Sequence, residues 1–165
     1  MGRLFIRYQT FLLRHFKRKV EPVKRFLIYY IICSLIVPTP VFASGIRVDP
    51  NTPKTNVPTL DKAQNNVPVV NIANPTTGGV SANKFKDYNV GSDGVILNNS
   101  TEIGQSQLGG ALYNNPNFKD GQAADIVMFQ VTGTGKSHLN GYQEMFGKSA
   151  DFILANPRGI QVNGG

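Results

Sequence analysis

The segment 133–137, Gly-Thr-Gly-Lys-Ser, has the composition of the end of a phosphate-binding loop. Such a loop needs a glycine five residues before Gly135, where the backbone turns over the phosphates, and that position is Gln130. The missing glycine, and the lack of room for a long strand–helix–strand unit, favour an ordinary turn. No nucleotide site is therefore predicted here.

Histidine, cysteine and carboxylate side chains offer little further chemistry. His138 is the only histidine after residue 43, and the single cysteine, Cys33, precedes it, so zinc lacks soft ligands. Ser137, His138 and Asp125 have the residue types of a hydrolytic triad, but no nucleophile elbow accompanies them. The carboxylates are few and scattered, and no spacing pairs two of them as acid and base. We therefore predict no catalytic residue, metal site or cofactor, and we do not expect an enzyme.

Two Asn-Pro motifs, NPNF at 115–118 and NPRGI at 156–160, share one turn design. In each, the leading asparagine can accept a hydrogen bond from the backbone two residues on, and proline fixes the first turn dihedral. Gly159 can adopt a positive φ, and the apolar residues Phe118 and Ile160 are expected to re-enter the core. Asn-Pro turns are common, so two ordinary turns are an alternative. The candidate functional residues are Asn115, Pro116, Asn117, Phe118, Asn156, Pro157, Arg158, Gly159 and Ile160.

Short apolar segments must position these turns. Each is of strand length, is rich in Val, Ile, Leu and aromatic residues, and is bounded by Asn, Gly or Ser. No segment offers a helical apolar stripe, so the region is predicted to be all-β. The expected strand segments are 67–72, 80–90, 94–97, 103–113, 124–131, 152–155 and 160–162. Residues 44–66 contain three prolines, which favour an extended lead-in or an edge strand.

Asparagine recurs at the ends of these segments, where it tolerates left-handed backbone angles and caps turns. In a strand–turn–strand array, such residues repeat at corners and can stack as ladders between coils. The centres of four apolar segments, Val70, Ile96, Val127 and Ile153, lie 26 to 31 residues apart, which suits a solenoid with one coil per repeat. A β-sandwich with short strands and frequent turns is also compatible with the pattern.

The net charge of +7 in the 165-residue chain comes entirely from its N-terminus. Residues 1–25 carry eight basic residues and one acidic residue, whereas 44–165 carry nine of each. The 12-residue apolar segment 26–37 is followed by Val-Phe-Ala, so 1–43 is predicted to be an extended, helical signal peptide cleaved between Ala43 and Ser44. That segment is shorter than the roughly 20 residues of a spanning helix, so no membrane span is expected after cleavage. Because the charge belongs to the signal, nucleic acid is not an expected partner.

Around the Asn-Pro motifs the chain resembles the N-terminal secretion domain of two-partner-secretion (TPS) exoproteins. This family includes filamentous haemagglutinins and contact-dependent growth inhibition toxins. The similarity covers about residues 45–165 in order, and the long basic start of the signal peptide also looks like that of the family. Phe118 stands where leucine is usual, and Arg158 stands where asparagine is usual. The segments that carry the resemblance are 67–73, 79–85, 88–90, 94–100, 107–112, 115–118, 131–132, 137–141, 150–151 and 155–165.

The resemblance implies a right-handed parallel β-helix in 67–165, incomplete because only its N-terminal coils would be present. It also implies secretion targeting of a large surface adhesin or contact-dependent toxin. The chain would cross the inner membrane by the Sec translocon, lose its signal to signal peptidase, and be recognised in the periplasm by an outer-membrane β-barrel transporter with POTRA domains. It would then nucleate folding outside a Gram-negative cell, secreted or at the surface, with the two Asn-Pro motifs as recognition or folding elements. The chain is expected to be a truncated fragment of marginal stability.

Two alternatives belong to other functional classes. A small secreted β-helical enzyme acting on polysaccharides would need clustered carboxylates or bases, which the sequence does not show. A carbohydrate-binding module would use Tyr88, Tyr113 and Tyr142 to stack on sugars, although core or edge packing is favoured for these residues.

Overall fold

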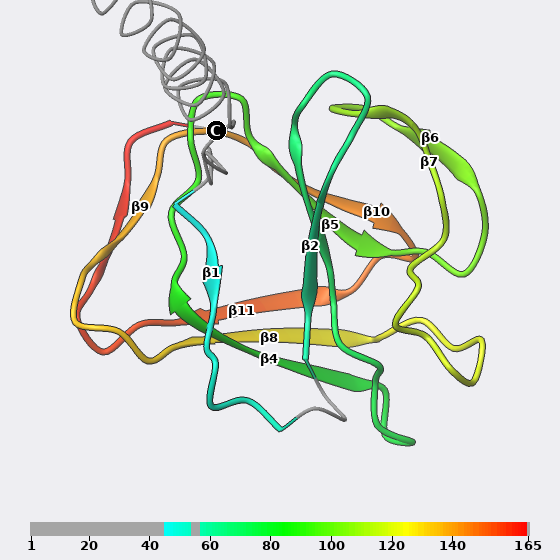
Figure 1. The fold of residues 1–165 in the computed structure, drawn as a ribbon, viewed down its shortest axis with the longest axis horizontal. Coiled ribbons are helices and arrows are strands. Elements are labelled where there is room, and N and C mark those ends of the chain that lie inside the picture. Colours follow the sequence, from blue (N-terminus) through cyan, green and yellow to red (C-terminus); the bar gives the residue numbers. More distant parts are fainter. Residues whose placement is uncertain (1–44, 54–56, 165) are drawn as a thin grey trace, which may run out of the picture. The chain divides into compact units, whose positions relative to one another are not determined.

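The computed structural model describes residues 45–53 and 57–164, so the predicted signal peptide and its cleavage site at Ala43 and Ser44 lie outside the described residues. Strands are the only regular secondary structure in the described part, which confirms the all-β prediction (Figure 1). No helix in this part has the length and apolar character needed to span a bilayer. The strands are β1 (Arg47–Val48), β2 (Thr59–Lys62), β3 (Pro68–Asn71), β4 (Val80–Asp87), β5 (Val95–Asn99), β6 (Gly104–Ser106), β7 (Gly110–Leu112), β8 (Ile126–Val131), β9 (Ser137–Leu139), β10 (Gln143–Gly147), β11 (Asp151–Ala155) and β12 (Ile160–Val162).

Most strands pair in parallel and form three stacks. The first stack holds β3, β5 and β10, the second holds β4, β8 and β11, and the third holds β9 and β12 with a parallel bridge from Val90 to Leu139. The chain visits the stacks in the same order three times, at 68–90, 95–139 and 143–162, and we call these the first, second and third passes. In Figure 1, β8 of the second pass lies between β4 and β11. These parallel pairings differ from the antiparallel sheets of a β-sandwich.

The lead-in covers the first pass with two short strands that run antiparallel to it. β1 pairs with β4, and β2 pairs with β3. Asp49, which follows β1, accepts a hydrogen bond from Oγ1 of Thr132 at 2.6 Å, so this cover is tied to the end of β8. Pairing of this kind keeps the edges of the first pass from joining other chains.

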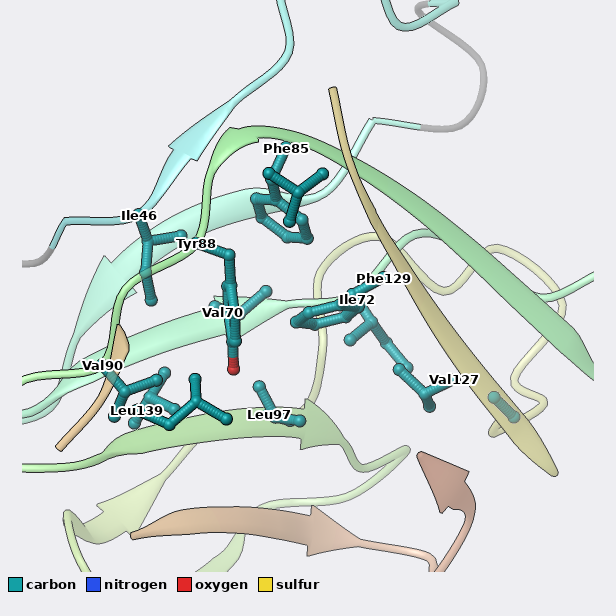
Figure 2. Close-up of a cluster of buried hydrophobic side chains, with 13 residues drawn as sticks. Ile46, Val70, Ile72, Phe85, Tyr88, Val90, Leu97, Val127, Phe129 and Leu139 are labelled. Atoms are coloured by element: carbon teal, nitrogen blue, oxygen red, sulfur yellow. The ribbon is translucent and has the colours of Figure 1, made fainter. Parts of the chain in front are cut away.

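The inner core lies between the stacks, and its buried side chains come from the lead-in and the first and second passes (Figure 2), with partly buried residues of the third pass packed against them. Phe85, Phe129 and Phe152 come from β4, β8 and β11, and the centroids of successive rings are 4.6 and 5.1 Å apart. Tyr88 packs edge-on against Phe129, and its hydroxyl donates to Oε1 of Gln143 at 2.7 Å. Burial raises the pKa of Tyr88, so this hydroxyl keeps the proton that it donates. Tilted and edge-on aromatic pairs stabilise a core beyond the burial of their area.

A second apolar cluster covers the outer face of the β3–β5–β10 stack. Val69, Ile96 and Phe146 each come from one strand of the stack, and Leu112 of the β6–β7 hairpin packs with them. Val70 belongs to the inner core instead, so both faces of this stack are buried. Strands buried on both faces do not alternate, which explains the continuous apolar runs in 67–72 and 94–97.

The predicted strand segments differ from the structure in two places. Within 103–113 the chain forms the antiparallel hairpin β6–β7 rather than one strand, because it turns at 107–109 and enters β7 at Gly110, which has a φ of 75°. The sequence pattern also does not predict β9 and β10, which are short and rich in polar residues. Pairing with the neighbouring passes forms these strands where local propensity is weak.

Candidate functional site

The first Asn-Pro turn has the predicted local geometry. The backbone N–H of Asn117 donates to Oδ1 of Asn115 at 2.9 Å, and the N–H of Phe118 donates to the carbonyl of Asn115 at 3.3 Å. Phe118 is half-buried and packs against the inner core, as expected for the residue that re-enters it. Pro116 at the apex is exposed. The motif therefore forms an asparagine-capped turn that returns the chain to the core.

Asn115 also joins two passes of the chain. The residue is 1% exposed, and its Nδ2 donates to the carbonyls of Ile72 at 2.9 Å and Asn98 at 2.7 Å. Ile72 follows β3 in the first pass, and Asn98 lies on β5 in the second. The two donors of one buried amide thus serve backbone carbonyls of two passes, and the carbonyl of Ile72 also accepts from Nδ2 of Asn117 at 3.2 Å.

Asn117 extends the same link toward the lead-in. Its Nδ2 donates to the carbonyl of Asn71 at 2.9 Å and lies 3.3 Å from Oγ1 of Thr59 on β2. The first motif therefore contacts β2, β3 and β5, which belong to one sheet.

Asparagines outside the motifs continue this network. Asn98 and Asn71 are register neighbours on β5 and β3, and Nδ2 of Asn98 donates to Oδ1 of Asn71 at 2.8 Å. Nδ2 of Asn99 donates to the carbonyls of Ala124 at 2.9 Å and Lys148 at 2.8 Å. The ladder predicted for the asparagine corners is therefore present between the first two passes. The sequence pattern predicts these asparagines at corners, because they lie at the ends of apolar segments, but it does not predict that they belong to the site.

The second Asn-Pro turn repeats the local geometry at another corner, between β11 and β12. The N–H of Arg158 donates to Oδ1 of Asn156 at 2.8 Å, and Gly159 has a φ of 106°, the positive value predicted for it. Nδ2 of Asn156 donates to Oγ of Ser137 at 2.9 Å and to the carbonyl of Gly135 at 3.2 Å. These bonds reach only the second pass, and they share no partner with those of the first motif.

The expectation that Ile160 re-enters the core is wrong. Ile160 is 42% exposed and belongs to neither apolar cluster. It lies on β12, which pairs with β9 alone among the described strands. Pro157 and Arg158 at the apex are exposed as well. The second motif therefore makes its turn without the apolar anchor that Phe118 supplies to the first.

The residue types of a hydrolytic triad do not come together. Ser137 is fully buried and accepts its hydrogen bond from Asn156, whereas His138, the next residue, is exposed. Asp125 instead forms an exposed ion pair with Lys148, with Nζ and Oδ1 2.5 Å apart. This arrangement offers no nucleophile next to a base.

The segment 133–137 is a turn into β9, as predicted. A Cβ at Gly133 would clash with the carbonyl oxygen of Lys86, so glycine is needed for the close approach of the first and second passes. In the described part of the chain, no group of three or more His, Cys, Asp or Glu residues is placed to hold a metal ion.

Curated relatives of the chain are much longer proteins. Residues 44–165 match the family model described as a TPS secretion domain. The 16S rRNA endonuclease CdiA of Enterobacter cloacae subsp. cloacae is 54% identical over 126 residues, which are 76% of this chain and 4% of that protein. Filamentous hemagglutinin of Bordetella pertussis is 52% identical over 100 residues, which are 61% of this chain and 3% of that protein.

A solved structure supports the same relationship. The crystal structure of a filamentous hemagglutinin secretion domain matches with a TM-score of 0.63 and 44% identity, over 72% of this chain and 37% of that one. The chain spans only 3% to 4% of the length of these two relatives, so the comparison concerns one domain of them. Since the family model matches every residue that the structure describes, the chain belongs to the family of TPS secretion domains.

Proposed function

We propose that residues 44–165 target a much longer exoprotein for export by a dedicated outer-membrane transporter. A TPS secretion domain is a targeting domain rather than a catalytic one, and TPS exoproteins of Gram-negative bacteria are secreted or exposed at the cell surface. The observation that carries the proposal is the family match over 44–165. The nuclease activities in the names of the CdiA relatives belong to those proteins, of which this chain matches 4%.

The proposed route begins at the signal peptide, 1–43. The Sec translocon would carry the chain across the inner membrane, signal peptidase would cut between Ala43 and Ser44, and POTRA domains of the transporter would bind the domain in the periplasm. The distribution of charge supports this division, since the first 25 residues carry the whole net charge of +7.

We further propose that the three passes are the first coils of a right-handed parallel β-helix that starts folding outside the cell. β1 and β2 cover the first pass, whereas β10, β11 and β12 each pair with a strand of the second pass alone in the described residues. Later passes of a longer exoprotein would add at this uncovered side. An uncovered pass is also the reason to expect marginal stability of the domain by itself.

The two Asn-Pro motifs would contribute to both folding and recognition, through different residues. The side chains of Asn115 and Asn117 are engaged in bonds within the domain, which supports a role in folding. Pro116, Pro157 and Arg158 are exposed and are the motif residues that a transporter could reach on the folded domain.

The enzyme and carbohydrate-module alternatives are not favoured as the function of the chain. Ser137, His138 and Asp125 do not converge. Tyr88, one of the three tyrosines considered for sugar stacking, is 1% exposed and lies in the inner core.

Export of a reporter protein tests the proposal. We expect residues 1–165, fused to a reporter, to carry it into the medium only when the transporter is present. Asn115→Ala should reduce export strongly, whereas Asn114→Ala should not, because Asn114 is an exposed neighbour outside the network of asparagine bonds. If export is the same with and without the transporter, the domain does not target the chain to it. If Asn115→Ala is exported as well as the unchanged chain, the first Asn-Pro motif has no role in export.

A further inference from the structure

A cleft lies on the outer face of the β2–β3–β5–β10 sheet, beside the β6–β7 hairpin. The hairpin packs with Ile96 and Phe146 on one part of this face. The cleft occupies the neighbouring part, with a volume of about 320 Å³, and it is lined by residues of β2, β3, β5, β7 and the first Asn-Pro turn. This volume lies in the range of small-ligand sites.

One wall of the cleft holds a buried amide with an unused donor. Asn71 is 4% exposed. The orientation of its neighbour Asn98 is fixed, because Oδ1 of Asn98 accepts from the N–H of Ser100 and Nδ2 donates to the carbonyl of Tyr113, both at 3.2 Å. Asn98 also donates to Oδ1 of Asn71, so Asn71 must present its Nδ2 elsewhere. That Nδ2 has no hydrogen-bond partner in the described residues, and Asn71 lines the cleft.

An unpaired donor of this kind favours a ligand with an acceptor oxygen. Oγ1 of Thr52 is the one fully buried side-chain polar atom without a partner in the described residues, so Nδ2 of Asn71 is open to solvent in the cleft, where a ligand oxygen could take the place of water. The other polar groups of the cleft are further hydrogen-bond donors and acceptors. Asp61 and Lys62 carry opposite charges that cancel, and Gln64 and Asn114 add amide groups. The lining therefore matches an uncharged molecule with several donors and acceptors, rather than an anion, a cation or an apolar ligand.

Tyr113 adds a flat aromatic surface to the cleft. It is 78% exposed, which is unusual for a large aromatic residue, and it lies between Leu112 and Asn114 of the lining. We propose that the cleft binds a neutral saccharide. Its hydroxyl groups would donate to Asp61 and accept from Asn71, and the C–H face of one sugar ring would pack on Tyr113. This site needs only the folded domain, so it goes beyond the export function and does not depend on it.

Titration of the complete chain with neutral oligosaccharides tests the proposal. The chain is refolded by dilution from urea, and maltotriose, cellotriose and N,N′-diacetylchitobiose are added while NMR follows the amide signals. We expect saturable shifts of the Asn71 side chain and its neighbours with at least one of these sugars. Tyr113→Ala should weaken that binding about tenfold, whereas Tyr113→Phe, which keeps the ring, should change it less than about threefold.

Tyr142→Ala is the matched control, because Tyr142 is 67% exposed but does not line the cleft. Affinity unchanged by this substitution supports the assignment. Equal weakening by Tyr142→Ala and Tyr113→Ala would overturn it, as would the absence of saturable shifts with all three sugars. Trialanine serves as a neutral probe of another chemical class. Larger saturable shifts with trialanine than with any sugar would show that the cleft prefers a peptide and would overturn the proposal of a saccharide.

Discussion

The two Asn-Pro turns have the same local design but different surroundings. In both, the side-chain oxygen of the leading asparagine accepts a bond from the backbone two residues on. Asn115 is buried, and its amide joins strands of the first and second passes. Asn156 is half-buried, and its amide reaches only the neighbouring second pass. Phe118 anchors the first turn in the core, whereas Ile160 is exposed after the second.

The difference shows that the contribution of a turn motif depends on what is stacked against it. An exposed polar group that loses its partner can bond to water, whereas a buried group that loses its partner keeps the full desolvation cost. The first turn lies among paired strands, and the second lies on the last described pass. Substitutions at matched positions of the two turns measure this difference directly.

The largest effect is expected from Asn115→Ala. The change removes the side-chain donor of the Asn98 carbonyl, one of the two side-chain donors of the Ile72 carbonyl, and the cap of the turn, so we expect a loss of about 3 kcal/mol of unfolding free energy. Urea unfolding followed by tyrosine fluorescence measures it. In a domain of marginal stability this loss would leave much of the chain unfolded, which limited proteolysis detects.

Asn114→Ala is the control for that measurement. Asn114 is exposed and precedes the buried residue directly, so its substitution should stay within about 0.5 kcal/mol of the unchanged chain. Similar losses for the two substitutions would show that the cross-pass bonds of Asn115 contribute little.

Gly159→Ala should have the next largest effect. A φ of 106° strains any residue with a side chain, but the nearest atom to an added Cβ, on Lys136, is 3.8 Å away. We therefore expect backbone strain alone, about 1 to 2 kcal/mol. Gly147→Ala provides the comparison, because Gly147 has a φ of 95° and its Cβ would also lie 2.5 Å from Cα of Ser100. If Gly159→Ala loses more unfolding free energy than Gly147→Ala, the passes stacked against a turn do not decide the cost of a substitution there.

Asn156→Ala should be milder than Asn115→Ala, at about 1 kcal/mol. It removes the cap at the exposed Arg158 and one side-chain bond to the buried Ser137, whereas Asn115→Ala removes the bonds of a buried amide to two buried backbone carbonyls. The same urea unfolding experiment measures it. If Asn156→Ala costs as much as Asn115→Ala, the two turns are equivalent and the comparison between them fails.

The local part of this comparison can be predicted from sequence, and the rest cannot. The capping bonds of Asn115 and Asn156 and the positive φ of Gly159 follow from short-range turn chemistry. The apolar segments likewise predict the strands that face the core. The burial of Asn115 and the exposure of Ile160 depend on which strands lie beside them, and these strands are far away in the sequence. β9 and β10 are missed for the same reason, since their pairing partners form them.

A smaller effect, on the pH dependence of stability, is expected from Asp49 in the lead-in that covers the first pass; the third pass has no such cover in the described residues. The Thr132 hydroxyl and the Asn51 backbone N–H donate to Asp49 and lower the pKa of its carboxyl below the ordinary 3.8. Ionised Asp49 therefore stabilises the fold above about pH 4, and this contribution is lost as the pH falls through the lowered pKa. Asp49→Asn should be less stable than the unchanged chain at neutral pH, and the difference should shrink in acid. A difference that is constant with pH would contradict the role of the ionised carboxylate.

The smallest effect is expected from Arg158→Asn, which restores the residue that is usual in the family at the apex of the second turn. Arg158 is exposed, and it joins the turn through its backbone N–H, which any residue other than proline supplies. Unfolding free energy should therefore change by no more than about 0.5 kcal/mol. Export is the more informative measurement, because the side chain stands at a surface that a transporter could contact. A change in export at unchanged stability would assign recognition to the second turn and leave folding to the first, whereas a change in stability would show that the exposed turn also supports the fold.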